Sequence, residues 1–158
     1  MRPEDNFMKT PALRAQGIAR GVLRLLQAHD FSGLQEMSLG NGRRADIVAL
    51  GRDGEIRIIE IKSSVADFRS DSKWPDYQPF CDRMYFAVAE DFPQALIPAG
   101  TGLIVADPYG GAIIREAPEQ KLAAARRKAI CLRFARLAAS RLLDQDLKLR
   151  LDSSSGDA

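Results

Sequence analysis

Two short runs rich in Ile and Val, joined by a link with two glycines, constrain this chain most strongly. The first run covers residues 44–50, the second covers 55–62, and the link is 51–54. Two such runs around a glycine-containing turn predict a β-hairpin. Because side chains alternate between the faces of a strand, superimposing the apolar faces of the two strands fixes their register. The facing pairs are then Val48 with Ile58, Leu50 with Ile56, and Asp46 with Glu60.

Asp46 and Glu60 are the unusual pair of this hairpin. Cβ atoms of directly opposed residues lie about 4.5–5.5 Å apart, and like charges there are destabilising. Both carboxylates also interrupt otherwise apolar faces, where an unpaired charge is costly to bury. Either one of the two is protonated or a cation lies between them.

A lysine and a divalent metal ion would together balance the two acids. Lys62 lies two residues after Glu60 and therefore on the same face of the strand. It supplies one positive charge but leaves carboxylate lone pairs free. Mg²⁺ is typically held by one or two carboxylates together with phosphate oxygens and waters. The sequence therefore predicts a metal-dependent phosphodiester site with Mg²⁺ or Mn²⁺ as its cofactor.

The same residues carry a resemblance to known proteins. Asp46 followed by Glu60-Ile61-Lys62 resembles the D…ExK signature of the PD-(D/E)XK nuclease superfamily, which has the restriction-endonuclease-like fold. A longer set of residues resembles one bacterial family, the MmcB-like DNA repair proteins, and is much more specific than the signature alone. This set comprises Arg44-Ala45-Asp46, Glu60-Ile61-Lys62-Ser63-Ser64, Asp67-Phe68, Ser70-Asp71, Lys73-Trp74, Tyr77, Cys81-Asp82-Arg83, Tyr85-Phe86-Ala87-Val88 and Gly102-Leu103-Ile104-Val105-Ala106-Asp107.

The resemblance implies a DNA repair protein that hydrolyses phosphodiester bonds of damaged or branched DNA. Asp46 and Glu60 would be catalytic metal ligands, with the Ile61 carbonyl as a backbone ligand. Lys62 would orient or deprotonate the attacking water, or neutralise the transition state as a fixed cation. Because one fold hosts many functions, two alternatives stay open. One is a DNA- or partner-binding repair module that turns over no substrate, and the other is an RNA-directed nuclease.

Two more residues are candidates for completing the site. Many nucleases of this superfamily place a further acid on the first helix, but residues 11–28 contain neither Asp nor Glu. Glu36 is then the candidate third carboxylate, with a solvated strand position as an equal alternative. Strand alternation places Glu36 on one face with Leu34, and Met37 on the other. Gln78 is the second candidate, because many superfamily members place a Gln or Lys on the helix after the ExK strand.

Six residues are candidates for binding nucleic acid. Arg43 and Arg44 form a basic turn before the first acid, and Arg matches phosphate with bidentate geometry. An ordinary basic loop explains them equally well. Trp74 and Tyr77 have the geometry to stack on a base, although aromatic side chains at helical spacing favour core packing. The remaining candidates are Arg69 and Lys73.

The rest of the chain predicts a mixed α/β fold. Thr10 and Pro11 begin an amphipathic helix that ends near His29, and its glycines, Gly17 and Gly21, predict close packing against a neighbour. Further strands are predicted at 31–38, 84–89, 102–106 and 112–115, and a long helix at about 118–149. This order fits the αβββαβ core of the restriction-endonuclease-like fold, a central mixed sheet flanked by helices.

The last predicted helix is basic along its first half. Residues 119–141 contain seven Lys and Arg and one acid. Such a run is able to follow a phosphate backbone, although charge runs more often form solvated surfaces. Superfamily nucleases often dimerise, so a homodimer and a repair-protein partner both stay open. The sequence shows no exposed apolar stripe that would identify an interface.

Length and composition exclude several other classes. With 158 residues the chain is expected to form one domain, 1–158, with disordered ends at about 1–9 and 152–158. The net charge of +2 is too small to argue nucleic-acid binding by itself. Cys81 and Cys131 form no CxxC pair, and the single His29 excludes a Cys/His zinc cluster. No apolar run approaches a membrane span and the start is unlike a signal peptide, so a cytoplasmic location is expected.

Overall fold

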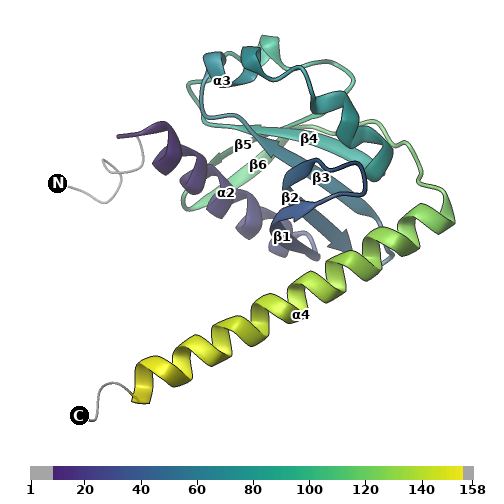
Figure 1. Cartoon of the computed structure of the whole chain (residues 1–158). Coiled ribbons are helices and arrows are strands. Elements are labelled where there is room, and N and C mark those ends of the chain that lie inside the picture. The colour runs from purple at the N-terminus through teal and green to yellow at the C-terminus, as the bar shows by residue number, and fades with distance from the viewer. Residues whose placement is uncertain (1–8, 155–158) are drawn as a thin grey trace.

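A six-stranded mixed sheet organises the computed structural model, which describes residues 9–154 (Figure 1). The strands are β1 (Phe31–Ser38), β2 (Arg44–Gly51), β3 (Ile56–Ile61), β4 (Arg83–Val88), β5 (Gly102–Asp107) and β6 (Gly110–Arg115), and they follow one another in this order across the sheet. β4 pairs with β3 and β5 in parallel, and the other neighbours are antiparallel. The helices are α2 (Pro11–Ala28), α3 (Val65–Ser70), η1 (Trp74–Phe80), η2 (Gln94–Leu96) and α4 (Ala124–Ser154). The predicted mixed α/β fold, with a sheet flanked by helices and a long C-terminal helix, is confirmed.

The β2–β3 hairpin has the predicted register. Val48 pairs with Ile58, and Leu50 pairs with Ile56. In the turn between the strands Gly54 has a φ of 85°, a conformation that glycine adopts without steric cost. Shifting the register by one residue would turn every side chain of one strand to the other face. The two apolar faces therefore select this alignment.

Helices cover both faces of the sheet. α2 packs on one face, where Ile18 and Val22 belong to the same buried cluster as Tyr85. The other face is covered by α3, η1 and the first turns of α4, whose Phe134 packs in a cluster with Phe86. The central strand β4 is therefore buried on both sides, which explains its continuous apolar run.

The predicted close approach of the first helix is confirmed at Gly21. A Cβ atom added there would collide with the backbone carbonyl oxygens of Asp107 and Gly110, at the β5–β6 turn. Thr10 caps the same helix, because its Oγ1 accepts a hydrogen bond of 3.1 Å from the Leu13 N–H. α2 is thus fixed at its start by a cap and at its middle by direct contact with the sheet.

α4 begins later than the sequence predicts. Residues 118–123 form no helix because Asp82 binds their backbone: its carbonyl accepts from Gln120 N–H at 2.7 Å and its carboxylate from Leu122 N–H at 2.9 Å. At the other end, α4 continues to Ser154, beyond its predicted end near residue 149 and into the segment predicted to be disordered. The rest of the predicted disorder, 1–8 and 155–158, lies outside the described residues. No helix of the described part, α4 included, is long and apolar enough to cross a membrane.

β1 breaks the predicted alternation at Glu36. This residue has a φ of 52°, in the left-handed region that few non-glycine residues adopt. Gln35 still pairs with Ile47 and Met37 with Ala45, but Met37 is buried in the cluster against which Leu34 also packs. The prediction that Leu34 and Met37 face opposite sides is wrong. The left-handed conformation of Glu36 interrupts the alternation of side chains, so that Met37 faces the same side of the sheet as Leu34.

Candidate functional site

Asp46 and Glu60 meet at the end of the β2–β3 hairpin that is farther from its turn. The pairing of Ile47 with Ile59 leads to the Asp46–Glu60 position, where side chains replace part of the main-chain ladder. Asp46 N–H donates to Glu60 Oε1 at 3.0 Å, and Ile61 N–H donates to Asp46 Oδ2 at 2.8 Å. The predicted juxtaposition of the two acids is confirmed.

Burial raises the pKa of both of these carboxyl groups. Glu60 is only 4% exposed, and burial together with the neighbouring charge of Asp46 raises the pKa of Glu60 to about 8. Burial also raises the pKa of Asp46, although the hydrogen bond from Ile61 N–H and the charge of Lys62 oppose this shift. At neutral pH the pair therefore holds a proton, or binds a cation in its place.

Lys62 lies beside the pair but is held by another acid. Its side chain is buried, and Nζ donates to Asp71 Oδ2 at 2.6 Å. Burial alone would raise the pKa of Asp71, but the hydrogen bonds from Lys62 and from Lys73 N–H outweigh it and lower this pKa below its usual value. The charge of Lys62 also favours ionisation of Asp46 and Glu60. One ammonium group thus interacts electrostatically with three carboxyl groups, those of Asp46, Glu60 and Asp71.

Two acids of this site, Asp71 and Asp67, were not predicted as site residues. Asp71 binds Lys62 directly, as described above. Asp67 accepts hydrogen bonds from Ser63 N–H at 3.0 Å and Ser63 Oγ at 3.3 Å, and its charge raises the pKa of Asp46. Both acids belong to the residues that carry the family resemblance, and this was the signal in the sequence that could have identified them.

Tyr77 is buried beside the acids, and Trp74 is half-buried against the core. The Tyr77 hydroxyl donates to the Arg44 carbonyl at 3.0 Å, and burial with the charges of Glu60 and Asp46 raises the pKa of Tyr77 to about 12. Trp74 packs edge-to-face on Phe86, with 5.7 Å between ring centroids. This is the core packing that the sequence favours over base stacking.

The other predicted site residues are more scattered. Arg43 pairs with Asp76 at 2.8 Å, whereas the side chains of Arg44, Arg69 and Lys73 are exposed. Glu36 is exposed as well, and its Oε1 lies 3.9 Å from Arg44 Nη2. The structure therefore leaves three of the basic candidates and the Glu36 carboxylate exposed, and it pairs Arg43 with an acid outside the Asp46–Glu60 pair.

Gln78 lies away from the acidic pair. It lines a small recess together with Cys81 and Asp82, and Asp82 is bound to Ile56 at the start of β3. Glu60 and Lys62 lie at the end of that strand. The structure thus does not bring Gln78 together with the two acids.

The oxygen ligands that the acidic pair offers are of the type that divalent metal ions such as Mg²⁺ bind. One oxygen of each carboxyl accepts a main-chain hydrogen bond, and the two carboxyl groups are hydrogen-bonded to each other, so a metal ion would take the place of the shared proton. Two carboxylates are within the usual protein contribution to a Mg²⁺ site, with water and phosphate supplying the rest. Within residues 9–154, however, no group of three or more His, Cys, Asp or Glu side chains is arranged to hold a metal ion.

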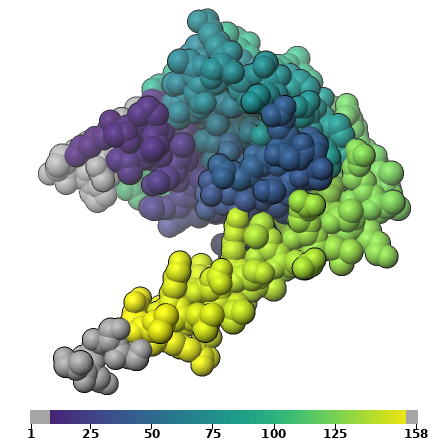
Figure 2. Space-filling model, in the orientation of Figure 1, coloured from purple at the N-terminus to yellow at the C-terminus, as the bar shows by residue number. Residues whose placement is uncertain are grey.

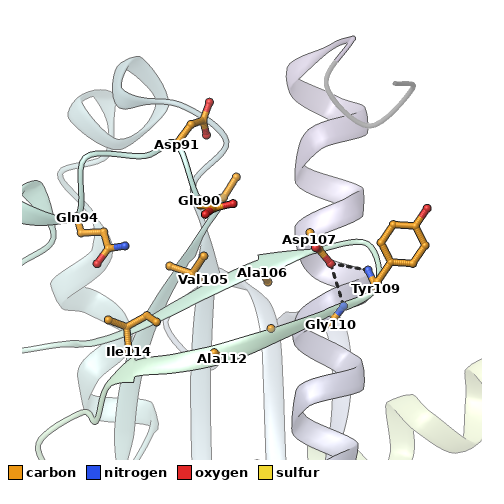
Figure 3. A pocket seen from close by; sticks show the side chains of 12 residues that line it. Glu90, Asp91, Gln94, Val105, Ala106, Asp107, Tyr109, Gly110, Ala112 and Ile114 are labelled. Atoms are coloured by element: carbon orange, nitrogen blue, oxygen red, sulfur yellow. Dashed lines mark hydrogen bonds between the residues drawn. The ribbon is translucent and has the colours of Figure 1, made fainter. Parts of the chain in front are cut away.

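A large hollow of the described part of the chain lies elsewhere, over β5 and β6. It has a volume of about 890 Å³ and an apolar floor that includes Val105, Ala112 and Ile114. Figure 3 shows Glu90 and Asp107 at its rim, with Asp107 Oδ1 bound to the N–H groups of Tyr109 and Gly110. Asp46 and Glu60 are not among the residues that line this hollow.

Fold and site together define a class: a mixed α/β protein with a buried glutamate, a half-buried aspartate and a buried lysine at the end of a central hairpin. Residues 8–148 match the family model described as DNA repair protein MmcB-like, so the chain belongs to the MmcB-like family. It is also similar to a solved structure, the SPO1766 protein of unknown function from Silicibacter pomeroyi, at 51% sequence identity and a TM-score of 0.79. The alignment covers 81% of this chain and 88% of that one. No curated protein matches the chain.

Proposed function

We propose that this member of a DNA repair family hydrolyses phosphodiester bonds of damaged or branched DNA at Asp46, Glu60 and Lys62. The observation that carries the proposal is the pair formed by half-buried Asp46 and buried Glu60, the latter with a pKa raised to about 8, beside buried Lys62. Strongly perturbed acids with a specific charged partner are typical of functional sites. This arrangement also matches the D…ExK signature of the PD-(D/E)XK superfamily.

Each residue has a distinct part in this proposal. Asp46 and Glu60 would hold Mg²⁺ or Mn²⁺, with the Ile61 carbonyl as a further ligand. When bound, the ion would lower the pKa of a water molecule and stabilise charge on the phosphate. Lys62 would position that water or balance the charge that develops on the phosphate. Asp71, whose Oδ2 lies 2.6 Å from Lys62 Nζ, would hold the ammonium group in place.

The basic side chains around the pair would bind the DNA backbone. Arg44, Arg69 and Lys73 are exposed, and Arg43 is partly exposed although it pairs with Asp76. Contacts of this kind position a nucleic acid without reading its sequence. The protein would therefore recognise its substrate by the shape of the DNA and not by its base sequence, as expected for a repair intermediate.

Cleavage assays test the proposed activity. Purified protein is incubated with nicked, flapped, branched and single-stranded DNA in the presence of Mn²⁺, and products are resolved on denaturing gels. We expect cleavage of at least one substrate, and a loss of about 100-fold or more in Lys62→Ala, because a fixed charge near the reacting phosphate is removed. Lys121→Ala, an exposed lysine outside the site, is the control. Unchanged cleavage by Lys62→Ala would show that the site assignment is wrong.

Calorimetric titration tests the metal site separately. We expect Mn²⁺ to bind the wild-type protein at pH 8.5, and binding to be lost in Asp46→Asn and in Glu60→Gln. Binding should be weaker at pH 6, because a ligand carboxyl must lose its proton and the pKa of Glu60 is raised to about 8. Equal binding by wild-type protein and both variants would exclude this pair as the metal site.

A second function is favoured by one observation, the engagement of Lys62 by Asp71. A lysine already bound at 2.6 Å, with no third acid in the described residues arranged for a metal, also fits a repair module that binds DNA or a protein partner without turnover. The same panel separates the two functions. Binding of DNA without cleavage of any substrate would favour the module, and cleavage of an RNA panel alone would favour an RNA-directed nuclease.

A further inference from the structure

The C-terminal end of α4 extends beyond the rest of the molecule. Arg141 still contacts β1, because its guanidinium donates to the carbonyls of Gln35 and Glu36. Every residue of 142–153 is exposed, and Figures 1 and 2 show this end of α4 projecting clear of the sheet. Isolated helices of about a dozen residues are marginal in water, since most helical stability comes from packing of an apolar face. Contact with a further surface would supply that packing.

Three leucines form a stripe along one side of this segment, which corrects the prediction that no apolar stripe is exposed. Leu143, Leu147 and Leu151 are spaced four residues apart and are 58%, 50% and 66% exposed. Residues at this spacing lie one above the other on a helix. Rows of this kind pack into one another when two helices cross at about −50°, the commonest arrangement in globular proteins. The stripe therefore has the geometry of a helix-packing surface.

The charges on either side of Leu147 are self-complementary. Asp144 and Asp146 precede this leucine, and Lys148 and Arg150 follow it. If two copies of the segment lie antiparallel about Leu147, each acidic half lies beside the basic half of the other copy. A parallel arrangement would instead place acids beside acids and bases beside bases, which is unfavourable.

We infer that the ends of α4 from two copies of this chain associate as an antiparallel, two-fold symmetric pair. In this pair Leu147 faces its own counterpart, and Leu143 faces Leu151 of the second copy. A two-fold axis uses the same surface on both copies, so such a surface must be self-complementary. The leucine stripe and the charge order around it both meet this condition. The inference does not depend on the proposed nuclease activity.

A second copy fits this surface better than DNA or a lipid surface does. Residues 142–153 contain three acids and two bases, so the segment lacks the excess of positive charge that phosphate groups attract. Helices that lie on membranes are rich in Lys and Arg on their polar face, and this one has more acids than bases. The basic part of α4 lies earlier, where the helix is packed on the body of the protein.

Sedimentation equilibrium of the full chain tests the inference. The contact is small, so we expect reversible association between about 1 µM and about 1 mM. Leu147→Gln/Leu151→Gln should weaken the dimer at least about tenfold, because apolar contact is lost while helix propensity is nearly unchanged. The matched control is Leu142→Gln/Leu149→Gln, which removes two leucines that are 69% and 67% exposed on the opposite side of the helix. It should leave the association constant within about twofold.

Charge reversal provides an independent readout of orientation. Asp144→Lys/Asp146→Lys and Lys148→Glu/Arg150→Glu should each self-associate more weakly than the wild type, because like charges then face one another. An equimolar mixture of the two should form a heterodimer. All of these positions are exposed, so the fold should be retained, as circular dichroism would verify. The inference is overturned if the wild type stays monomeric over the whole concentration range; the stripe would then be a contact surface for another macromolecule. It is also overturned if both double-glutamine variants lose the same dimer affinity, or if the two charge-reversed variants form no heterodimer when mixed.

Discussion

Asp82 and Glu60 are two buried acids near opposite ends of β3, and their pKa values shift in opposite directions. Asp82 is 2% exposed and Glu60 is 4% exposed, but Glu60 lies deeper among protein atoms, so burial raises its pKa more strongly than that of Asp82. The pKa of Asp82 is lowered, whereas that of Glu60 is raised to about 8. The difference lies in what surrounds each carboxyl group.

Asp82 receives a full set of donors. Its oxygens accept hydrogen bonds from Ile56 N–H at 2.7 Å, from Leu122 N–H at 2.9 Å, and from the Arg127 guanidinium at 2.7 Å to each oxygen. Burial would raise the pKa of this carboxyl, but these bonds outweigh it. The result is a stable carboxylate that ties α4 and the segment before it to the sheet.

The acids at the other end of β3 have fewer donors. Asp46 and Glu60 receive one main-chain hydrogen bond each, and the nearby ammonium of Lys62 is bound to Asp71. The comparison teaches that a buried acid with many hydrogen-bond donors is held as a carboxylate, whereas one with few donors has a raised pKa. A carboxyl group with few hydrogen-bond donors and little positive charge around it binds a proton or a cation more readily.

The largest expected effect comes from removing the partner of the saturated acid. Arg127→Ala should lower the free energy of unfolding by about 3 kcal/mol, because it leaves the buried Asp82 carboxylate without its countercharge. Urea denaturation at pH 7 measures this. Arg136→Ala, an exposed arginine on the same helix, should change it by no more than about 0.5 kcal/mol. Equal losses in the two variants would contradict the structural role of Asp82.

The pH dependence of stability should separate the two ends next. Because the pKa of Glu60 is higher in the folded state, the folded protein binds more protons between pH 4.5, near the unfolded value, and pH 8. In the metal-free protein its contribution to stability should therefore fall as pH rises through this window, by up to about 1.4 kcal/mol per pH unit. Asp82, whose pKa is lowered, acts in the opposite sense, with stability lost as pH falls below about 4.

Urea denaturation across this pH range, with a chelator present, is the measurement. Glu60→Gln should remove most of the slope between pH 4.5 and pH 8 and leave the loss at acid pH, since glutamine keeps the shape of the side chain without its proton equilibrium. A wild-type slope near zero, or one retained in Glu60→Gln, would show that the carboxyl pair is not destabilised by ionisation.

The smallest expected effect concerns Glu36. Its carboxylate is exposed and lies 3.9 Å from Arg44, so Glu36→Gln should change the free energy of unfolding by no more than about 0.5 kcal/mol. Its Mn²⁺ affinity by calorimetry should stay within about twofold of the wild type. A tenfold loss, about 1.4 kcal/mol, would instead identify Glu36 as a third metal ligand.

Much of the fold could be predicted from local patterns. The hairpin register followed from strand alternation, because only one alignment superimposes the apolar faces of Val48 and Leu50 on those of Ile58 and Ile56. The first helix followed from its Thr-Pro start. These rules failed at two places. Glu36 has a left-handed backbone conformation that interrupts strand alternation, and Asp82 binds the backbone that was expected to begin α4.

The candidate site could be predicted only in part. Asp46, Glu60 and Lys62 were identifiable because two neighbouring strands position them through their register. Asp71 was not, because it lies on an irregular segment after α3, where no periodicity indicates which way a side chain points. Gln78 was predicted near the acids because superfamily members place such a residue on the helix after the ExK strand. In the structure it lies beside Asp82, near the opposite end of β3.

The sequence by itself determined which side chains share a face of the central hairpin, and hence that Asp46 and Glu60 lie together. Only the tertiary structure decided how each buried acid is supplied with donors. The reason is physical: the partners of Asp82 come from Ile56 and Arg127, 26 and 45 residues away in the chain. Alternation along a strand is a local property, whereas the charge around a buried group is set by segments that meet only in the folded protein.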